Sequence, residues 1–462
     1  MTAAQAIGID IGGTHIRAAR VAPDGTILAR AAAPSSPDPT TVRATCLSLV
    51  EKVFGPDVRA IGIGVPGQVH IASRTVLSGG YVDLSSLPFA QEIETATGLP
   101  VIIDNDATMA LLGEVACGAA RGRANVVMLT IGTGIGGAIL SEGTVLRGRG
   151  AAGQLGHLTV DPQGRPCVCG KRGCVETVSS GTAFGTHLAE AGLPAATRVE
   201  DLLARSDAAA QAVLAAWTRP LRTAIDTLIA TCNPDLVLLG GGAGGAAAAA
   251  IAQFPADPSW FHAELAAAQL GDDAGVIGAA LSALPKPRRA VLVNGVPASG
   301  KSGVARALAQ TTGWPVLTLD TVKAPFLTEL APVDRMLNRT LGRASYAAIF
   351  DLVAETAPGS TVIIDAWFGF QPPEVLEAGL MRAGIVETVE LWCQAPPETI
   401  GARYAARVGT RPAGHPGLDY VPELIALAAR ARPNDRGPRQ NIDTTRPLDT
   451  QALAAWVTTH LR

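Results

Sequence analysis

Residues 9–17 read IDIGGTHIR, an apolar run that contains a carboxylate and continues into two glycines and a threonine. Gly12 and Gly13 carry no side chains, so backbone N–H groups can approach the oxygens of a phosphate there, and the hydroxyl of Thr14 adds a donor. Asp10 lies at the end of the buried strand, where its carboxylate can help to hold a metal-bound water. The stretch predicts a phosphate-binding turn after the first strand of an α/β fold, although an ordinary β-turn can have the same residues.

Two later segments, at 130–139 and 240–245, repeat this pattern. The first reads TIGTGIGGAI, and the second, GGGAGG, follows the apolar run LVLL, where a nucleotide base or ribose can lie close to the backbone. Their candidate nucleotide-binding residues are Gly132, Thr133, Gly134, Gly241 and Gly242. Three such turns in one part of the chain favour a nucleotide site over three unrelated β-turns.

Strand-like runs bounded by glycine or proline recur along the chain, and helix-sized spacers separate several of them. This alternation predicts α/β architecture, with sheets packed under helices. The natural linker is SALPKPRR (282–289), which has two prolines and three basic residues. We therefore expect one unit at 1–284, which is large enough for two lobes, and a second at 285–462.

The composition limits the class of protein and its partners. Of the 462 residues, 48% are hydrophobic and 17% are charged, which is typical of a folded, well-buried protein. The net charge of -3 argues against nucleic acid or an anionic membrane as the main partner, and small metabolites fit better. Most of the seven cysteines are scattered singly and no signal-peptide pattern opens the chain, so we expect a reducing, cytoplasmic location.

Residues 156–176 read GHLTVDPQGRPCVCGKRGCVE and contain one histidine and three cysteines. A Cys₃His set binds zinc tetrahedrally and leaves no open position, which indicates a structural metal. The expected ligands are His157, Cys167, Cys169 and Cys174, and the intervening glycines allow the chain to curl around the ion. Chance clustering of free thiols is the alternative, and a redox dithiol at CVC would leave the histidine unexplained.

The order of these motifs resembles the ROK family of sugar kinases, which has the actin/hexokinase-like ATPase fold. The resemblance covers essentially all of 1–284, and the histidine-and-cysteine segment is its most specific match. It implies two RNase H-like lobes that close on ATP, Mg²⁺ and a sugar, and it is consistent with a homodimer. The matching segments are, in chain order, IDIGGTHIR, VPG, NDA, TIGTGIGG, GHLTVDPQGRPCVCGKRGCVE, LVLLGGG and DDAGVIGAA.

The resemblance implies that Asp106, the aspartate of the NDA motif, is the catalytic base that takes the proton of a sugar hydroxyl. It also implies that Glu176 and the zinc ligand His157 bind sugar hydroxyls. Asn105 is suited to orienting a sugar hydroxyl, and Gly67 of the VPG motif is a further candidate at the sugar site. Taken alone, Asp106 could instead be the N-cap of a helix that follows a strand.

One residue departs from the family pattern. The family commonly has a glutamate three residues before the histidine, whereas AAGQLGH places Gln154 there. A carboxylate only accepts hydrogen bonds, whereas an amide both donates and accepts them. We therefore expect catalysis to persist but the sugar to differ from the usual glucose-like set, with N-acetylated, keto or deoxy sugars and sugar acids as candidates.

A branch of the family consists of sugar-responsive repressors that carry a helix-turn-helix before the kinase-like unit. This chain enters its first strand by about residue 6, and its net charge of -3 does not favour DNA. We therefore expect a kinase.

A P-loop pattern, GVPASGKS, runs from Gly295 to Ser302, between the strand-like AVLVN and the helix-compatible GVARALAQ. Backbone N–H groups as far as Gly300 would surround the phosphates, Lys301 would reach the β- and γ-oxygens, and Ser302 would bind Mg²⁺. Asp365, at the end of the apolar run in STVIIDAW, is expected near the metal or the attacking hydroxyl.

The C-terminal unit resembles small P-loop kinases of the gluconate-kinase, shikimate-kinase and chloramphenicol-phosphotransferase type. Asp320, which ends the strand-like run PVLTLD (315–320), matches the acceptor-binding or basic carboxylate of these enzymes, with Lys323 nearby. RYAARVGTRPAGHPG resembles their lid, with Arg403 and Arg407 on one face of a helix that ends by Pro412, where arginine could neutralise phosphate. A solvated basic surface is the alternative for these arginines.

We therefore predict a bifunctional ATP-dependent enzyme, in which a sugar kinase is fused to a kinase of a second small metabolite. The predicted catalytic residues are Asp106, Lys301, Asp320 and Asp365. The alternative is a single sugar kinase whose C-terminal unit binds ATP as a regulatory sensor. A pure sensor needs no carboxylate on the acceptor side, so Asp320 favours the first prediction.

Overall fold

The computed structural model describes residues 4–80, 82–255, 259–410 and 415–461. It divides the chain into two compact units, Met1–Leu284 and Pro285–Arg462. Among the helices of the described residues, none combines the length and the apolar character needed to cross a bilayer.

The first sheet of the N-terminal unit has five strands in the order β3-β2-β1-β4-β7. β1 pairs antiparallel with β2, and β2 with β3, whereas β1, β4 and β7 run parallel. Helices α1 (Pro39–Val53) and α2 (Phe89–Thr97) pack against it. The strands are β1 (Gln5–Ile11), β2 (His15–Val21), β3 (Ile27–Pro34), β4 (Val58–Val65) and β7 (Val101–Asn105).

A second five-stranded sheet, in the order β10-β9-β8-β11-β12, repeats the strand directions of the first. Alternate residues of its strands face opposite layers, so Val127 and Leu129 pack with helices α7 and α8, whereas Val126 and Met128 pack on the α3 side. Its strands and covering helices are β8 (Val126–Ile131), β9 (Ile135–Ser141), β10 (Thr144–Val145), β11 (Leu236–Gly240), β12 (Glu264–Ala267), α7 (Ala208–Cys232) and α8 (Gly244–Ala252). The repetition confirms the predicted pair of RNase H-like halves.

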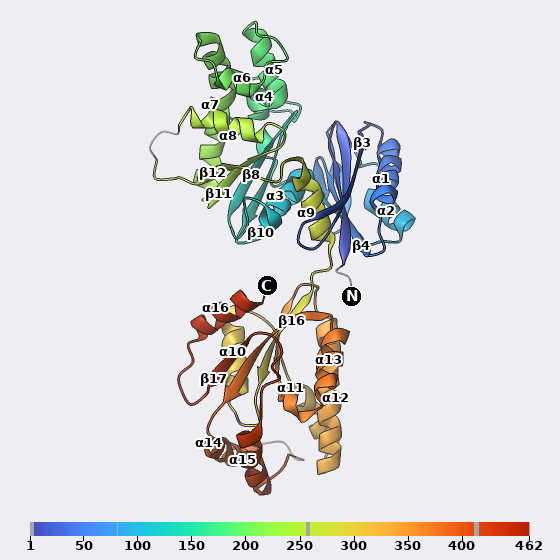
Figure 1. Ribbon diagram of the computed structural model, residues 1–462, viewed down its shortest axis with the longest axis vertical. Helices are drawn as coiled ribbons and strands as arrows, with labels where there is room; N and C mark the ends of the chain where they lie inside the picture. Colours follow the sequence, from blue (N-terminus) through green and yellow to red (C-terminus); the bar gives the residue numbers. More distant parts are fainter. Residues whose placement is uncertain (1–3, 81, 256–258, 411–414, 462) are drawn as a thin grey trace. The chain divides into compact units, whose positions relative to one another are not determined.

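Two helices, α3 (Asp106–Cys117) and α9 (Ala274–Ala283), pack against each other between the two sheets (Figure 1). Glycines allow this close approach: a Cβ on Gly278 of α9 would lie 1.8 Å from the backbone oxygen of Met109 on α3. A Cβ on Gly8 of β1 would lie equally close to the backbone oxygen of Val276. The packing fixes the start of α3, where the predicted base lies, against the first sheet.

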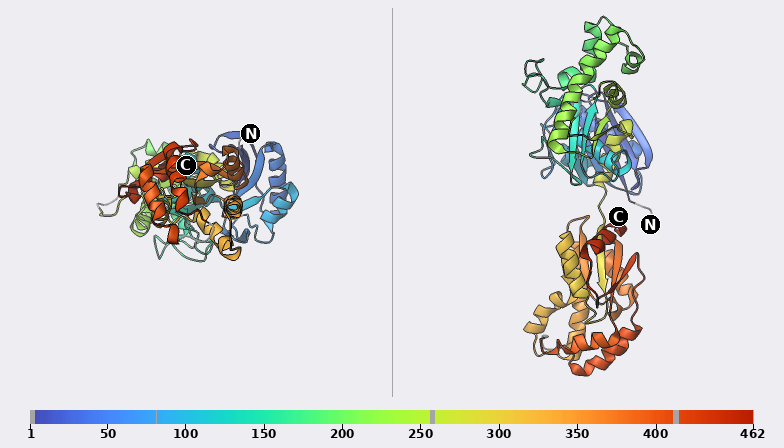
Figure 2. Two further views of the ribbon diagram at one scale, coloured as in Figure 1. Left: turned by 90° about the horizontal axis from the view of Figure 1, so that it is seen from below. Right: turned by 90° about the vertical axis from the view of Figure 1, so that its left-hand side faces the viewer.

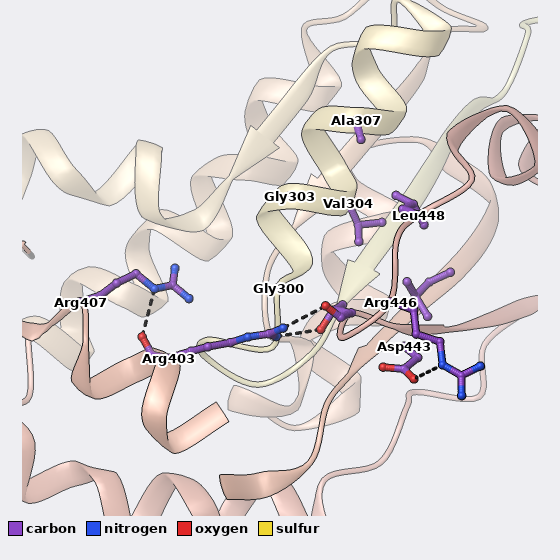
Figure 3. Close-up of a pocket in the computed structure, with 11 residues that line it drawn as sticks. Gly300, Gly303, Val304, Ala307, Arg403, Arg407, Asp443, Arg446 and Leu448 are labelled. Carbon is purple, nitrogen blue, oxygen red and sulfur yellow. Dashed lines mark hydrogen bonds and ion pairs between the residues drawn. The ribbon is translucent and has the colours of Figure 1, made fainter. Parts of the chain in front are cut away.

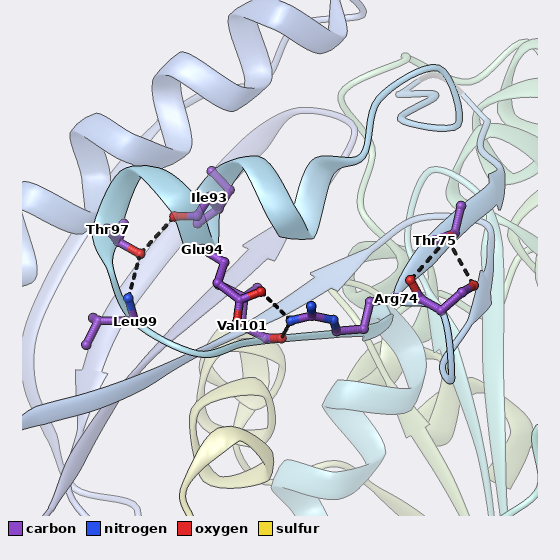
Figure 4. A network of polar contacts seen from close by, with 8 residues as sticks. Arg74, Thr75, Ile93, Glu94, Thr97, Leu99 and Val101 are labelled. Atoms are coloured by element: carbon purple, nitrogen blue, oxygen red, sulfur yellow. Dashed lines mark hydrogen bonds and ion pairs between the residues drawn. The ribbon is translucent and has the colours of Figure 1, made fainter.

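A short hairpin, β5 (Gln68–His70) and β6 (Thr75–Ser78), follows the VPG motif. Its turn is held by Arg74, whose Nη1 donates to Glu94 Oε2 at 2.6 Å and to the carbonyl of Val101 at 3.0 Å (Figure 4). This network attaches the hairpin to α2 and to the beginning of β7. The remaining helices of the unit are the 3₁₀ turns Leu155–His157 and Gly271–Asp273 and the α-helices α4 (Glu176–Ser179), α5 (Gly181–Glu190) and α6 (Val199–Leu203).

The C-terminal unit has a parallel sheet in the order β14-β15-β13-β16-β17, with helices on both faces (Figure 2). One hydrophobic core joins the sheet to α10 and α16, and the other joins it to α12 and α13. Its elements are β13 (Arg288–Asn294), α10 (Lys301–Thr312), β14 (Val316–Thr318), α11 (Leu319–Glu329), α12 (Arg335–Ala354), β15 (Thr361–Asp365), α13 (Pro373–Arg382), β16 (Ile385–Gln394), α14 (Pro397–Ala405), α15 (Val421–Arg430), β17 (Arg439–Asp443), α16 (Thr450–His460) and the 3₁₀ turns Phe368–Phe370, Val408–Thr410 and Leu418–Tyr420.

Two local expectations for this unit were wrong. Asp320 does not end a strand but lies in the first turn of α11, because the Thr318 hydroxyl accepts from the N–H of Thr321 at 3.0 Å and caps the helix. Arg407 lies beyond the end of α14, since its N–H bonds to the carbonyl of Tyr404 in a tighter turn, at 3.0 Å. Pro412 lies outside the described residues.

Candidate functional site

The end of β7 and the start of α3 form the turn that contains Asn105 and Asp106. Asn105, not Asp106, caps α3: its Oδ1 accepts from the N–H of Thr108 at 3.2 Å. Its Nδ2 donates to the carbonyl of Gly67 at 2.9 Å, which joins this turn to the VPG motif. Asp106 Oδ1 accepts from the N–H of Ala107 at 2.8 Å, so its carboxylate is held at the N-terminus of the helix. We call residues 104–106 the base turn.

Two carboxylates interact at this end of the first sheet. Burial, and to a smaller extent the negative charge of Asp10, raise the pKa of Asp106 to about 7. Burial also raises the pKa of Asp10 to about 6, although Arg17, 3.8 Å away, partly opposes the rise. Asp106 therefore has a pKa suited to a general base near neutral pH.

The three glycine-rich turns all follow strands, as predicted. In the first, the N–H of Gly12 donates to the carbonyl of His15 at 3.0 Å, and Gly13 and Thr14 are exposed. In the second, the N–H of Gly132 donates to the carbonyl of Gly134 at 2.9 Å. The third turn contains Gly241 and Gly242.

Gly241 has a φ of +76°, and a Cβ there would lie 2.6 Å from the carbonyl oxygen of Ile131, at the end of β8. A Cβ on Gly242 would meet no atom within 4 Å, so space is open beside its backbone. The second and third turns therefore lie together at the carboxyl ends of β8 and β11, where a nucleotide can approach the backbone.

The four predicted zinc ligands come together. Their ligand atoms all lie within 4.8 Å of one another, with His157 Nδ1 3.5 Å from Cys167 Sγ and Cys169 Sγ 3.6 Å from Cys174 Sγ. This set of one nitrogen and three sulfurs fits tetrahedral zinc. Because Nδ1 of His157 faces the thiols, Nε2 is on the other side of the ring, where it can meet a different ligand.

Glu176 follows this cluster and begins α4. Its Oε2 accepts from the N–H of Ile135 at 2.8 Å, which attaches the carboxylate to the turn that begins β9. A Cβ on Gly134 would lie 2.4 Å from the same oxygen, so a side chain there would displace the Glu176 carboxylate. Gln154 directly precedes the 3₁₀ turn Leu155–His157 and is half-buried. Its backbone carbonyl accepts a hydrogen bond from the N–H of His157 at 3.2 Å.

Sequence reasoning missed an ion pair that involves the first residue of the base turn. Arg147 donates through Nε and Nη2 to Asp104 Oδ2, at 2.9 Å each. Asp104 stands directly before Asn105 and could have been noted from the motif DNDA. No local sequence pattern predicted a role for Arg147, because its partner Asp104 is distant in sequence.

The P-loop residues of the C-terminal unit gather at the carboxyl end of the sheet. Gly300, with a φ of +92°, precedes α10, and Lys301 and Ser302 form its first turn. Asp365 is buried at the end of β15, and its Oδ1 is without a hydrogen-bond partner among the described residues. Burial raises the pKa of Asp365, whereas Lys301 and Ser302 lower it and the exposed Asp320 raises it again. The four predicted groups thus interact electrostatically.

A cavity of about 460 Å³ lies beside this P-loop (Figure 3). Arg403 lines it and donates to Thr444, from Nη1 to the hydroxyl and from Nη2 to the carbonyl, at 2.9 Å each. The Thr444 hydroxyl in turn donates to the carbonyl of Ser299 at 2.7 Å. Sequence reasoning did not find Thr444, although it placed both Arg403 and Arg407, which line the cavity.

Comparisons with known proteins match the two units separately. The ROK family profile matches residues 6–285, and an AAA domain profile matches 291–417. A glucokinase of Halalkalibacterium halodurans is 33% identical over 307 residues, covering 59% of this chain and 92% of the relative. An N-acetylmannosamine kinase of Escherichia coli is 34% identical over 291 residues, covering 60% and 97%. A crystal structure of a ROK glucokinase from Streptomyces griseus with glucose and AMPPNP has a TM-score of 0.54 and 31% identity, covering 60% of this chain and 99% of that one.

Proposed function

Because the chain belongs to the ROK family, we propose that its N-terminal unit transfers a phosphoryl group from ATP to a hydroxyl of a hexose or of an amino or keto sugar. The observation that carries this proposal is the base turn, where Asp106 has a pKa raised to about 7 beside Asp10. Proteins named glucokinase and N-acetylmannosamine kinase are among the relatives, which supports a sugar as the acceptor.

In the proposed reaction, Asp106 accepts the proton of the sugar hydroxyl as that oxygen attacks the γ-phosphorus of ATP. Asn105, anchored on Gly67, orients the sugar from one side, and Glu176 and His157 Nε2 bind hydroxyls from the other. The glycine-rich turns would hold the phosphates, and Mg²⁺ bound with ATP would supply charge neutralisation there. Proton transfer and charge neutralisation are the two requirements of phosphoryl transfer.

We propose that His157 and the three cysteines hold zinc, which would fix the loop that presents His157 and Glu176 to the sugar. Backbone hydrogen bonds fold the loop, such as that from the N–H of Cys167 to the carbonyl of Lys171 at 2.8 Å, but Cys169 is exposed and the glycines at 170 and 173 adopt positive φ angles. A bound metal would restrict these glycines and reduce the entropy lost when the sugar binds. The homodimer and the cytoplasmic location remain predictions.

The C-terminal unit, in our proposal, phosphorylates a second small metabolite. Lys301 and Ser302 would hold the phosphates and Mg²⁺, the cavity lined by Arg403 and Arg407 would take the rest of the nucleotide, and Asp320 or Asp365 would face the acceptor. Support comes from the electrostatic interaction of Asp320 with Asp365. A unit that only senses ATP has no need of this carboxylate pair.

Replacing the base tests the first activity. The full chain with Asp106→Asn should lose about 10²- to 10⁴-fold in sugar phosphate formation while it retains ATP binding. Lys301→Ala is the matched control, since it alters the other nucleotide site and should leave sugar phosphate formation unchanged. A turnover of Asp106→Asn close to that of the wild type would remove Asp106 from the base role.

The same variant isolates the second activity. The full chain with Asp106→Asn should still release ADP with at least one compound from a panel of sugars, polyols and sugar acids. Adding Lys301→Ala to it should abolish that release. ATP binding without release for any compound would instead support the regulatory sensor.

A further inference from the structure

The Asp104–Arg147 ion pair joins the two halves of the sugar site. We propose that this pair positions segment 148–157, which contains Gln154 and His157, against the base turn, and so acts as a positioning element of the sugar phosphorylation proposed above. The inference rests on that proposed function. Neither residue is assigned a role in proton transfer or in sugar binding.

Both oxygens of Asp104 are used. Oδ1 accepts from the N–H of Asn105 at 2.8 Å, which fixes the backbone of the base turn, and Oδ2 accepts from Nε and Nη2 of Arg147. The Asp104 side chain is 9% exposed and that of Arg147 is 36% exposed. Burial raises the pKa of Asp104, and the guanidinium opposes this rise, so the ion pair favours the charged form of the carboxylate.

The backbone of Arg147 begins the segment that leads to the zinc loop. Its carbonyl accepts from the N–H groups of Gly150 at 2.9 Å and Ala152 at 3.2 Å. A Cβ on Gly150 would lie 2.7 Å from the carbonyl oxygen of Val69 in β5. The start of the segment therefore packs against the hairpin that follows the VPG motif. The side chain of Arg147 binds Asp104, which lies on β7.

The segment continues along the second sheet. A Cβ on Gly153 would lie 2.8 Å from the carbonyl oxygen of Gly137 in β9, and the next residues form the 3₁₀ turn that ends at His157. Asp104 belongs to the first sheet, whereas Arg147 follows β10 of the second. The ion pair therefore fixes the position of Gln154 and His157, which follow β10 of the second sheet, relative to Asp106, which follows β7 of the first sheet.

Positioning of this kind matters because phosphoryl transfer depends on the alignment of the attacking oxygen. A displacement of about 1 Å can cost about 10²-fold in rate. Loss of the pair should therefore impair the sugar site while the nucleotide turns, which lie on other segments, keep their affinity for ATP.

The test uses the full chain and measures sugar phosphate formation with the variants Arg147→Gln, Arg147→Lys, Asp104→Asn and the double variant Asp104→Asn/Arg147→Gln. We expect kcat/KM for the sugar to fall by about tenfold or more in each non-conservative single variant, with the KM for ATP changed by less than about twofold. The double variant should lose little more than the worse single variant, because the pair acts as one unit. Arg147→Lys should recover part of the loss, since it keeps the charge.

Arg149→Gln is the matched control, because Arg149 is an exposed arginine two residues further along the same segment. Thermal unfolding establishes that each variant is folded, and Asp104→Asn carries the test if Arg147→Gln does not fold. Two outcomes would overturn the inference and leave the proposed function standing. In the first, kcat/KM for the sugar falls no further in the single variants than in Arg149→Gln. In the second, the losses of the two single variants multiply in the double variant. A wild type that phosphorylates no sugar would overturn both.

Discussion

Burial and the negative charge of Asp10, at the end of β1, together raise the pKa of Asp106, at the start of α3, to about 7. A general base must be deprotonated to act, so sugar phosphorylation should be present above about pH 7 and lost as the pH falls through that value. The measurement is kcat/KM for the sugar from about pH 5 to about pH 9. Asp10→Asn removes the neighbouring negative charge, so it should move the acidic limb to lower pH in addition to lowering the rate. Asp24→Asn, an exposed control, should leave the limb in place, and an unmoved limb in Asp10→Asn would contradict the electrostatic coupling.

Cys167→Ser should reduce zinc content and raise the KM for the sugar together, because the loop that presents His157 and Glu176 would lose one of four ligands. Mass spectrometry of the purified protein gives the zinc content. Cys232→Ser, on α7, is the matched control and should change neither quantity. Full zinc occupancy in Cys167→Ser would exclude the proposed ligand set.

Gln154→Glu should broaden the range of sugars toward glucose-like substrates. A carboxylate in that place accepts hydrogen bonds from sugar hydroxyls, whereas the amide also donates one. The ratio of kcat/KM for glucose to that for the preferred sugar should rise by about tenfold. An unchanged ratio would mean that the side chain does not reach the sugar.

Thr444→Val should weaken ATP binding at the C-terminal unit by about tenfold, because the hydroxyl links Arg403 to the P-loop at Ser299. Titration with a fluorescent ATP analogue measures the affinity, and Lys301→Ala defines the part of the signal due to the other nucleotide site. Thr444→Ser keeps the hydroxyl and should restore the affinity.

The neighbouring Thr445→Val is the control for that experiment, since the Thr445 hydroxyl donates to Asp443 and not to the P-loop. Equal affinities for Thr444→Val and Thr445→Val would show that the link from Arg403 to Ser299 does not support nucleotide binding.

Gly278→Ala should lower the free energy of unfolding of the N-terminal unit by about 1–3 kcal/mol, because the added Cβ would overlap the backbone of α3 at Met109. Gly245→Ala on α8 is the matched control: a Cβ there meets no atom within 4 Å, so helix propensity should make it neutral or stabilising. Denaturant unfolding followed by a probe of the N-terminal unit distinguishes the two. Equal stabilities would mean that α3 and α9 can separate at small cost.

The sequence predicted the architecture well because the relevant signals are local. Strand-then-glycine patterns at 9–17 and 130–139 indicated the turns after β1 and β8, and the pattern GVPASGKS indicated the P-loop before α10. The antiparallel strands β2, β3 and β9 were not individually predicted, since the pairing of such strands depends on partners that are not local in sequence. The end of α14 before Arg407 was also missed, because helix ends are set by local hydrogen bonds that propensity does not reveal.

What the sequence alone determined was which chemical groups are present and in what order: the NDA aspartate, the glycine-rich turns, the Cys₃His set within a short loop, and the P-loop lysine and serine. Only the tertiary structure decided how distant groups act on one another. It pairs Asp104 with Arg147, and it links Arg403 to Ser299 through the hydroxyl of Thr444. It also brings Asp10 close enough to Asp106 to raise its pKa. The reason is physical: a motif specifies atoms within a few residues, whereas burial, charge interactions and the alignment of two sheets arise only when the folded chain excludes water and brings those segments together.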